Sequence, residues 1–249
     1  MTLKLKHLIP ASIAATVLFS GVANATIVTV YDDFDGGLVN FNNTVAGAGG
    51  IATHDVWSTQ LTGTSSNQGD YVVTNNDGGS LSSSIYTLYN SSPSRQTSGY
   101  MVSIDPDGAS RGIGAIGSGM TLTFNTAINA IGFEVGDWST CCQPSDLYIS
   151  FDDGTPILVG ASTVFGDGFL TNNGAGVFVA AFDDSGDFTK IQFWGDGFGE
   201  VLNAGGTIHY ALLDQGSLPP TNGVPEPASL ALLGIGMAGL AAMRRRKAA

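Results

Sequence analysis

Cationic side chains are scarce in this chain, and their scarcity excludes a large class of partners. Nine Lys and Arg residues stand against 21 Asp and Glu residues. Six of the nine cations lie near the two chain ends, so residues 26–223 carry three cations and 20 acids, a formal charge of −17. Such a surface repels phosphate backbones and has no Lys/Arg cluster that would release counterions. Nucleic acid is therefore excluded as a partner.

Histidine is nearly absent, which limits the catalytic chemistry open to the chain. Only His54 and His209 lie beyond residue 25, and no Gly-x-Ser-x-Gly sequence or other nucleophile context accompanies either of them. A paired-carboxylate glycosidase needs only two acids at a set separation, and the many acids here neither exclude such a site nor identify one. We expect that the protein is not an enzyme.

The only cysteines are adjacent, at Cys141 and Cys142. Neighbouring Cα atoms are about 3.8 Å apart, whereas an ordinary disulfide joins Cα atoms roughly 4.4–6.8 Å apart. In an oxidising compartment the pair can form a strained vicinal disulfide ring, or it can remain two thiols in a loop. The sequence leaves both states open, and no further ligands nearby support a metal site.

The segment between the chain ends also lacks long stretches of helical periodicity. Residues 120–124 and 131–135 alternate apolar and polar side chains, and we expect them to form neighbouring strands. Asp153-Gly154, between two apolar runs, predicts a hairpin. Residues 183–187 separate two further apolar runs and predict a second hairpin, and residues 207–213 predict the closing strand.

These patterns predict an all-β domain over residues 26–215. About ten short strands in one domain favour a β-sandwich, jelly-roll-like in its topology, over an open sheet. Residues 216–227 are rich in proline and predict a stiff, extended linker.

The N-terminus has the features of an export signal. Lys4 and Lys6 precede an apolar stretch from Leu8 to Val22, which ends at Ala23-Asn24-Ala25, a small-x-small cleavage sequence. Residues 1–25 therefore predict a signal helix and peptide, after whose removal the chain begins at Thr26.

The C-terminus carries a second apolar segment with a fixed order of parts. Pro225-Glu226-Pro227 opens a run from Ala228 to Met243, and Arg244, Arg245 and Arg246 follow it. The run is shorter than the ~20 residues that span a bilayer comfortably, yet it is too apolar to stay in water. The cations hold its end in the cytoplasm. Residues 228–249 thus predict a hydrophobic helix with a basic tail that attaches the exported chain to the membrane before processing.

This order of parts resembles the PEP-CTERM sorting signal of Gram-negative bacteria, which a membrane protease called an exosortase processes; an ordinary C-terminal membrane anchor is the alternative. Residues 127–137 are similar to a strand-and-turn phrase in the β-sandwich regions of many PEP-CTERM proteins. The resemblance implies export, processing by an exosortase as partner, and display on the cell surface or in an extracellular polysaccharide matrix, as in biofilm. It identifies no ligand.

Clusters of aspartate near glycine are candidates for a calcium site, with Ca²⁺ as the one cofactor to consider. Carboxylates and backbone carbonyls in such turns supply the hard oxygen ligands that Ca²⁺ requires. We single out Asp183, Asp184 and Asp187 as candidate ligands. Asp and Gly are also the ordinary residues of turns, so the plain structural interpretation stays open.

Three aromatic residues lie where predicted strands give way to loops: Trp138, Trp194 and Phe198. Their rings could stack on a sugar, although core aromatics at strand ends give the same pattern. We expect an exported surface or matrix protein whose sandwich binds a neutral or cationic extracellular polysaccharide weakly, because its charge repels anionic sugars. The alternatives are a calcium-dependent adhesin or lectin and a secreted polysaccharide-active enzyme.

Overall fold

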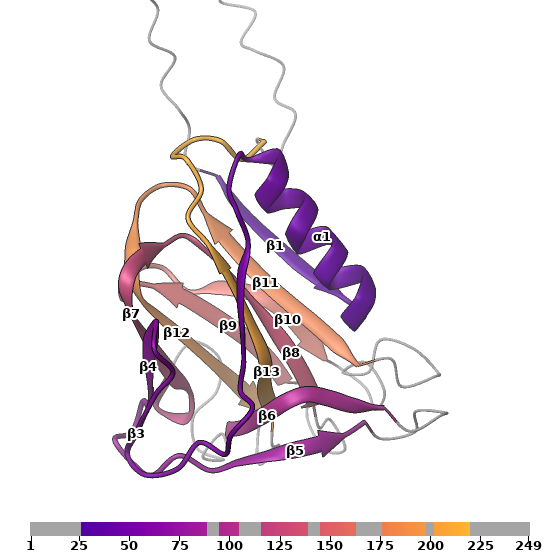
Figure 1. Cartoon of the computed structure of the whole chain (residues 1–249), viewed down its shortest axis with the longest axis vertical. Helices are drawn as coiled ribbons and strands as arrows, with labels where there is room; N and C mark the ends of the chain where they lie inside the picture. Colours follow the sequence, from indigo (N-terminus) through magenta and orange to yellow (C-terminus); the bar gives the residue numbers. More distant parts are fainter. Residues whose placement is uncertain are drawn as a thin grey trace, which may run out of the picture.

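The computed structural model describes residues 26–88, 95–104, 116–138, 145–162, 176–197 and 202–219. Within these residues, 13 strands form two antiparallel sheets that pack face to face, and one α-helix covers the outside of one sheet (Figure 1). The predicted all-β sandwich is confirmed. The predicted signal helix and C-terminal hydrophobic helix lie outside the described residues.

The large sheet has seven strands in the order β1-β11-β8-β13-β6-β5, and β2 pairs with β13 off this path. Its strands are β1 (Ile27–Asp32), β2 (Thr53–Val56), β5 (Ser83–Thr87), β6 (Gln96–Ile104), β8 (Ala130–Trp138), β11 (Val177–Asp183) and β13 (Leu202–Ala211).

The small sheet has six strands in the order β10-β9-β12-β7-β4-β3. Its strands are β3 (Ser65–Asn67), β4 (Tyr71–Asn75), β7 (Met120–Ile128), β9 (Ser145–Phe151), β10 (Ile157–Ser162) and β12 (Phe188–Gly197).

The core lies between the sheets, where alternate side chains of each strand meet. Phe133 of β8 packs against Phe193 of β12 with ring centroids 4.6 Å apart, and both side chains are fully buried. The intervening residues of the large sheet, such as Phe178 of β11, face outward and belong to a second apolar cluster. The large sheet is therefore apolar on both faces, and its outer face needs a cover.

Helix α1 (Phe34–Gly47) supplies that cover over β1 and β11 (Figure 1). Asp33 caps it by accepting a hydrogen bond from Gly36 N at 2.7 Å. Phe41 packs against Phe178 and Phe182, with centroids 6.1 and 5.2 Å apart. Gly37 allows this close approach, because a Cβ there would lie 2.6 Å from Phe178 Cβ. Helix α1 is not among the elements predicted from the sequence.

The predicted pairing of the strands around Asn129 is wrong. Strand β7 belongs to the small sheet and β8 to the large sheet, so the chain changes sheets at Asn129. The Asn129 side chain is buried, donates to Leu213 O at 2.9 Å, and accepts from Leu213 N at 2.7 Å. The alternation of apolar and polar residues predicted both strands correctly. It does not distinguish a hairpin, whose strands pair with each other, from a corner, at which the chain passes to the other sheet.

Residues 183–187 likewise do not form the second predicted hairpin, because β11 and β12 lie in different sheets. The first hairpin is confirmed: β9 and β10 pair antiparallel. Its turn lies at Asp152 and Asp153, whose φ angles are 44° and 59°, and Gly154 N donates to Phe151 O at 2.8 Å. Both central residues thus adopt the left-handed conformation of a type I′ turn.

A buried chain of hydrogen bonds joins the sheets at the β2–β4 edge. Trp57 Nε1 donates to Tyr71 Oη at 2.7 Å, and Tyr71 Oη donates to Asp55 Oδ2 at 2.7 Å. Tyr71 belongs to β4 of the small sheet and Asp55 to β2 of the large sheet. Burial, with the neighbouring Asp55 carboxylate, raises the pKa of Tyr71 far above its ordinary value. The phenol therefore stays a neutral donor that ties the two sheets together.

We expect Tyr71→Phe to destabilise the fold by about 1–3 kcal/mol, because it leaves the buried Trp57 N–H without an acceptor. Tyr210→Phe is the matched control: Tyr210 Oη donates to Asp70 at 2.6 Å, and Asp70 is exposed to solvent. Urea unfolding of both variants measures the difference. Equal losses for the two variants would contradict this role of Tyr71.

Candidate functional site

The two ends of the described sandwich meet at one buried carboxylate, that of Asp184. Asp184 Oδ1 accepts a hydrogen bond from Thr26 N at 2.6 Å, and Asp184 Oδ2 accepts one from Leu218 N at 2.7 Å. Figure 1 shows the start of β1 and the last described residues at the same end of the molecule. Asp184 itself directly follows β11, at the start of the connection to β12.

The backbone of Asp184 completes this arrangement. Asp184 N donates to Thr26 O at 3.4 Å, and Gly216 N donates to Asp184 O at 3.2 Å. The Asp184 side chain is 1% exposed, and Leu218 is 3% exposed within the apolar cluster under α1. The core thus extends past residue 215, where the sequence analysis placed the domain boundary.

This geometry corrects the candidate calcium site. Asp184 points into the protein, where backbone N–H groups occupy both of its oxygens, while Asp183 accepts from Ser185 N at 3.0 Å in a local turn. Asp187 is exposed. Throughout the described ranges, no three His, Cys, Asp or Glu side chains are grouped so that they could hold a metal ion. The turn therefore does not gather the three carboxylates as calcium ligands.

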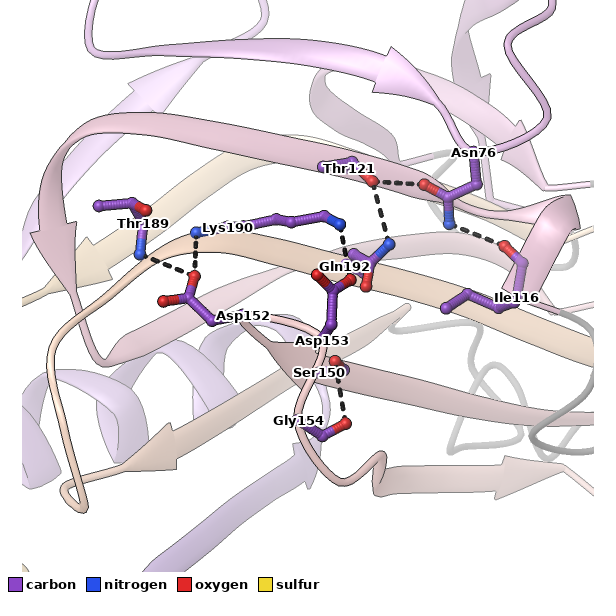
Figure 2. A network of polar contacts seen from close by, with 10 residues as sticks. All are labelled: Asn76, Ile116, Thr121, Ser150, Asp152, Asp153, Gly154, Thr189, Lys190 and Gln192. Carbon is purple, nitrogen blue, oxygen red and sulfur yellow. Dashed lines mark hydrogen bonds and ion pairs between the residues drawn. The ribbon is translucent and has the colours of Figure 1, made fainter.

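A second aspartate cluster, at the β9–β10 turn, also holds the fold together (Figure 2). Asp152 Oδ1 accepts from Thr189 N at 3.0 Å and from Lys190 N at 2.7 Å. Asp153 forms an ion pair with Lys190 Nζ at 2.6 Å. These contacts attach the turn to the start of β12.

The predicted aromatic site is not assembled around Trp194. The Trp194 side chain is fully buried, and Tyr148 stacks on it with centroids 5.7 Å apart. The prediction that Trp194 offers a ring face to a sugar is therefore wrong. The side chain of Trp138 and all of Phe198, Cys141 and Cys142 lie outside what the structure describes.

The same face of the small sheet has a row of polar side chains across its strands. Figure 2 shows Asn76, Thr121 and Gln192 in this row; Thr121 Oγ1 donates to Asn76 Oδ1 at 2.5 Å, and Gln192 Nε2 donates to Thr121 Oγ1 at 3.5 Å. Gln192 Oε1 and Trp194 Nε1 are buried and have no hydrogen-bond partner among the residues that the structure describes. Such atoms are ordinarily satisfied by a bound water.

Two titratable side chains on the outer face of the large sheet have perturbed pKa values. Burial raises the pKa of Glu134, although the hydrogen bond from Ser98 N at 2.9 Å opposes this shift. The pKa of His209 is lowered to about 4, mainly by burial and to a smaller extent by the nearby His54. The His209 ring lies 5.6 Å from the Phe178 ring and 5.9 Å from the Phe41 ring. Paired shifts of this kind occur at catalytic sites and also in packed cores, and here apolar rings enclose the histidine.

Comparison with known proteins adds one finding, which concerns the C-terminus beyond the Asp184 contacts. Residues 223–247 match the PEP-CTERM protein-sorting motif. The PEP-CTERM motif includes the predicted Pro225, Glu226 and Pro227 and the predicted Arg244, Arg245 and Arg246. It marks the protein as an exported protein that an exosortase sorts and processes. No curated protein matches the chain.

The helix found in the described part of the chain is not of the kind that crosses a membrane. Over residues 26–219, with their gaps, the structure contains no helix of sufficient length and hydrophobicity for a membrane span. The PEP-CTERM motif, with its hydrophobic run, lies after these residues.

We expect His209 to make the fold less stable in mild acid. Its pKa is 6.5 when unperturbed and about 4 in the folded protein, so between these values the unfolded chain binds a proton that the folded chain excludes. The free energy of unfolding therefore falls as the pH drops from 6.5 to 4, by about 1–2 kcal/mol after solvent screening is allowed for.

Urea unfolding of wild type and His209→Gln across this pH range measures the effect. The raised pKa of Glu134 acts in the opposite direction, since its contribution is lost as pH rises, but it is common to both proteins and cancels in their difference. His54→Gln removes the smaller of the two causes of the shift and leaves His209 buried, so it should change the pH profile less than His209→Gln does. A wild-type pH profile parallel to that of His209→Gln would refute the assignment.

Proposed function

We propose that the protein is a structural component of the cell surface or of an extracellular polysaccharide matrix, displayed as an acidic β-sandwich after sorting by exosortase. The observation that carries this proposal is the PEP-CTERM motif directly after a domain whose first and last segments meet at Asp184. Thr26 and Leu218 thus lie at the same end of the sandwich.

The way the polar groups are used favours a structural role over catalysis. Asp55, Asp152 and Asp184 all accept hydrogen bonds that join separate segments of the sandwich. His209 lies among phenyl rings rather than next to a nucleophile. These three carboxylates thus serve the connections within the fold.

Processing provides the first test. We expect the native surface protein to lack residues 1–25 and the basic tail, because a signal peptidase and an exosortase remove them. Replacing Arg244, Arg245 and Arg246 by Ala leaves Lys247 as the sole cation behind the hydrophobic run, so the orientation of the tail and its processing should be impaired.

Intact-mass measurement of wild type and the triple variant, expressed in a host that has an exosortase, reads out both events. Arg95→Ala, a cation change inside the domain, is the control and should be processed normally. Native protein that still carries residues 244–249 would contradict processing by exosortase.

We further propose weak binding of a neutral or cationic polysaccharide through Trp138 and Phe198. One stacked ring contributes about 1 kcal/mol, which corresponds to dissociation constants nearer millimolar than nanomolar, and display in many copies raises the working strength. Affinity gels with neutral glucans and chitin derivatives should retard the wild type but not Trp138→Ala. Equal migration of the two proteins on every gel would refute this part of the proposal.

A further inference from the structure

We infer that removal of the signal peptide converts the Thr26–Asp184 hydrogen bond into a buried ion pair, which locks both ends of the sandwich. The inference rests on the proposed export, because it requires cleavage between Ala25 and Thr26. The bond broken is the Ala25–Thr26 peptide bond, which water hydrolyses to a carboxylate on Ala25 and an amine on Thr26.

Cleavage changes the charge of an atom that is already in place. Before cleavage, Thr26 N is an uncharged amide that lies 2.6 Å from Asp184 Oδ1. After cleavage it is an α-amine, which is protonated below its ordinary pKa of ~7.7–8.0. No movement is needed, because 2.6 Å is already the separation of a charge-assisted hydrogen bond.

The surroundings of Asp184 explain why a cation belongs there. A buried carboxylate is costly unless it is paired with a positive charge or hydrogen-bonded. Asp184 is 1% exposed and receives two backbone hydrogen bonds. The ion pairs found among the described residues, Arg95–Asp35 and Lys190–Asp153, lie elsewhere on the surface. The new ammonium of Thr26 supplies a countercharge next to Asp184 that neither of these ion pairs provides.

The other charged groups on the segments around Thr26 have the same sign as Asp184. They are Asp183 at the end of β11, Asp187 before β12, and Asp214 on the segment that leads to Leu218. All of them favour the protonated amine, as does the contact with Asp184 at 2.6 Å, whereas the burial of Thr26 opposes it. We expect the adjacent carboxylate to outweigh burial and to raise the pKa of the amine in the folded protein. The stability that the ion pair adds is complete below pH ~7.7 and is lost as the pH rises through the raised pKa.

The ion pair also acts on the C-terminal segment. Because Asp184 holds Leu218 N through its second oxygen, a carboxylate fixed by the ammonium holds Leu218 in the apolar cluster more firmly. Release of the N-terminus from the signal peptide thereby secures the segment that leads to the PEP-CTERM motif.

Amine labelling tests the inference directly. Both apolar clusters lie between Val30 and Leu218, so a chain of residues 26–223 contains all of their members. That chain has only two amines, Lys190 Nζ and the α-amine of Thr26. At pH 7 an acetylating reagent should label the α-amine of the folded chain at least about tenfold more slowly than that of the urea-unfolded chain, the factor that one pKa unit gives. Peptide mapping distinguishes this label from one on Lys190.

Variants separate the ion pair from general burial. Asp184→Asn should make the α-amine reactive, while Asp183→Asn, the neighbouring acid, should leave it protected. If Asp184→Asn fails to fold, a chain with one glycine before Thr26 replaces it: this chain keeps every side chain but moves the charge outward. Its α-amine should react freely. The chain that begins at Thr26 should lose thermal stability as the pH rises through the pKa of its α-amine, and the glycine-extended chain should not show this loss.

Three results would overturn the inference. The first is an α-amine of Thr26 that is labelled as fast in the folded chain as in the unfolded one, and the second is an α-amine that stays protected in the Asp184→Asn or glycine-extended chain. The third is a thermal midpoint that changes identically with alkaline pH in the chain that begins at Thr26 and in the glycine-extended chain. N-terminal sequencing of exported protein tests the cleavage site separately. A different native N-terminus would therefore count against the processing, whereas the labelling experiment counts for or against the geometry.

Discussion

The placement of Asp184 determines how this sandwich begins and ends. Its carboxylate bonds to Thr26 at one end of the chain and to Leu218 at the other, while its own backbone lies at the connection from the large sheet to the small one. Three segments far apart in sequence therefore converge on one side chain. Without this side chain Thr26, at the start of β1, would lose the acceptor of its N–H, and so would Leu218 in the apolar cluster under α1.

Buried polar side chains join separate segments at two other places in the sandwich as well. Asn129 lies at the corner between β7 and β8, and its side chain forms hydrogen bonds with the backbone N–H and C=O of Leu213. The hydroxyl of Tyr71, in the small sheet, bonds to Asp55 of β2 in the large sheet and to Trp57, which follows β2. The apolar core gives the layers their attraction, and these few buried polar groups fix how the layers are connected, because each would be costly to leave unpaired.

The sequence predicted the layers better than the connections. Alternation and turn residues identified most strands of residues 120–194 and the Asp152-Asp153 turn, because these signals are local. They assigned β8 and β12 to the wrong partners. A corner such as that at Asn129, where the chain passes to the other sheet, has the same kind of sequence as a hairpin turn, and only the packing of the sheets distinguishes them. Helix α1 was missed, although Asp33 before Phe34, with Phe41 and Val45 at helical spacing, is an N-cap followed by an apolar stripe.

The candidate site shows the same limit. The PEP-CTERM motif is a linear signal, so residues 223–247 could be predicted from the sequence. The role of Asp184 could not, since Asp183 and Asp184 are alike in sequence and only the fold turns one outward and the other toward Thr26. Trp194 was misjudged for the same reason: a strand-end tryptophan is exposed or buried according to what packs on it.

Hydrogen exchange at the Leu218 amide tests most directly whether Asp184 holds the two ends together. In the chain that begins at Thr26, this amide should be protected as strongly as the amides of β13 and should exchange only when the core opens. The reason is that Asp184 accepts its hydrogen bond inside the protein. Exchange at the rate of an open tail, while β13 stays protected, would contradict the central role given to Asp184.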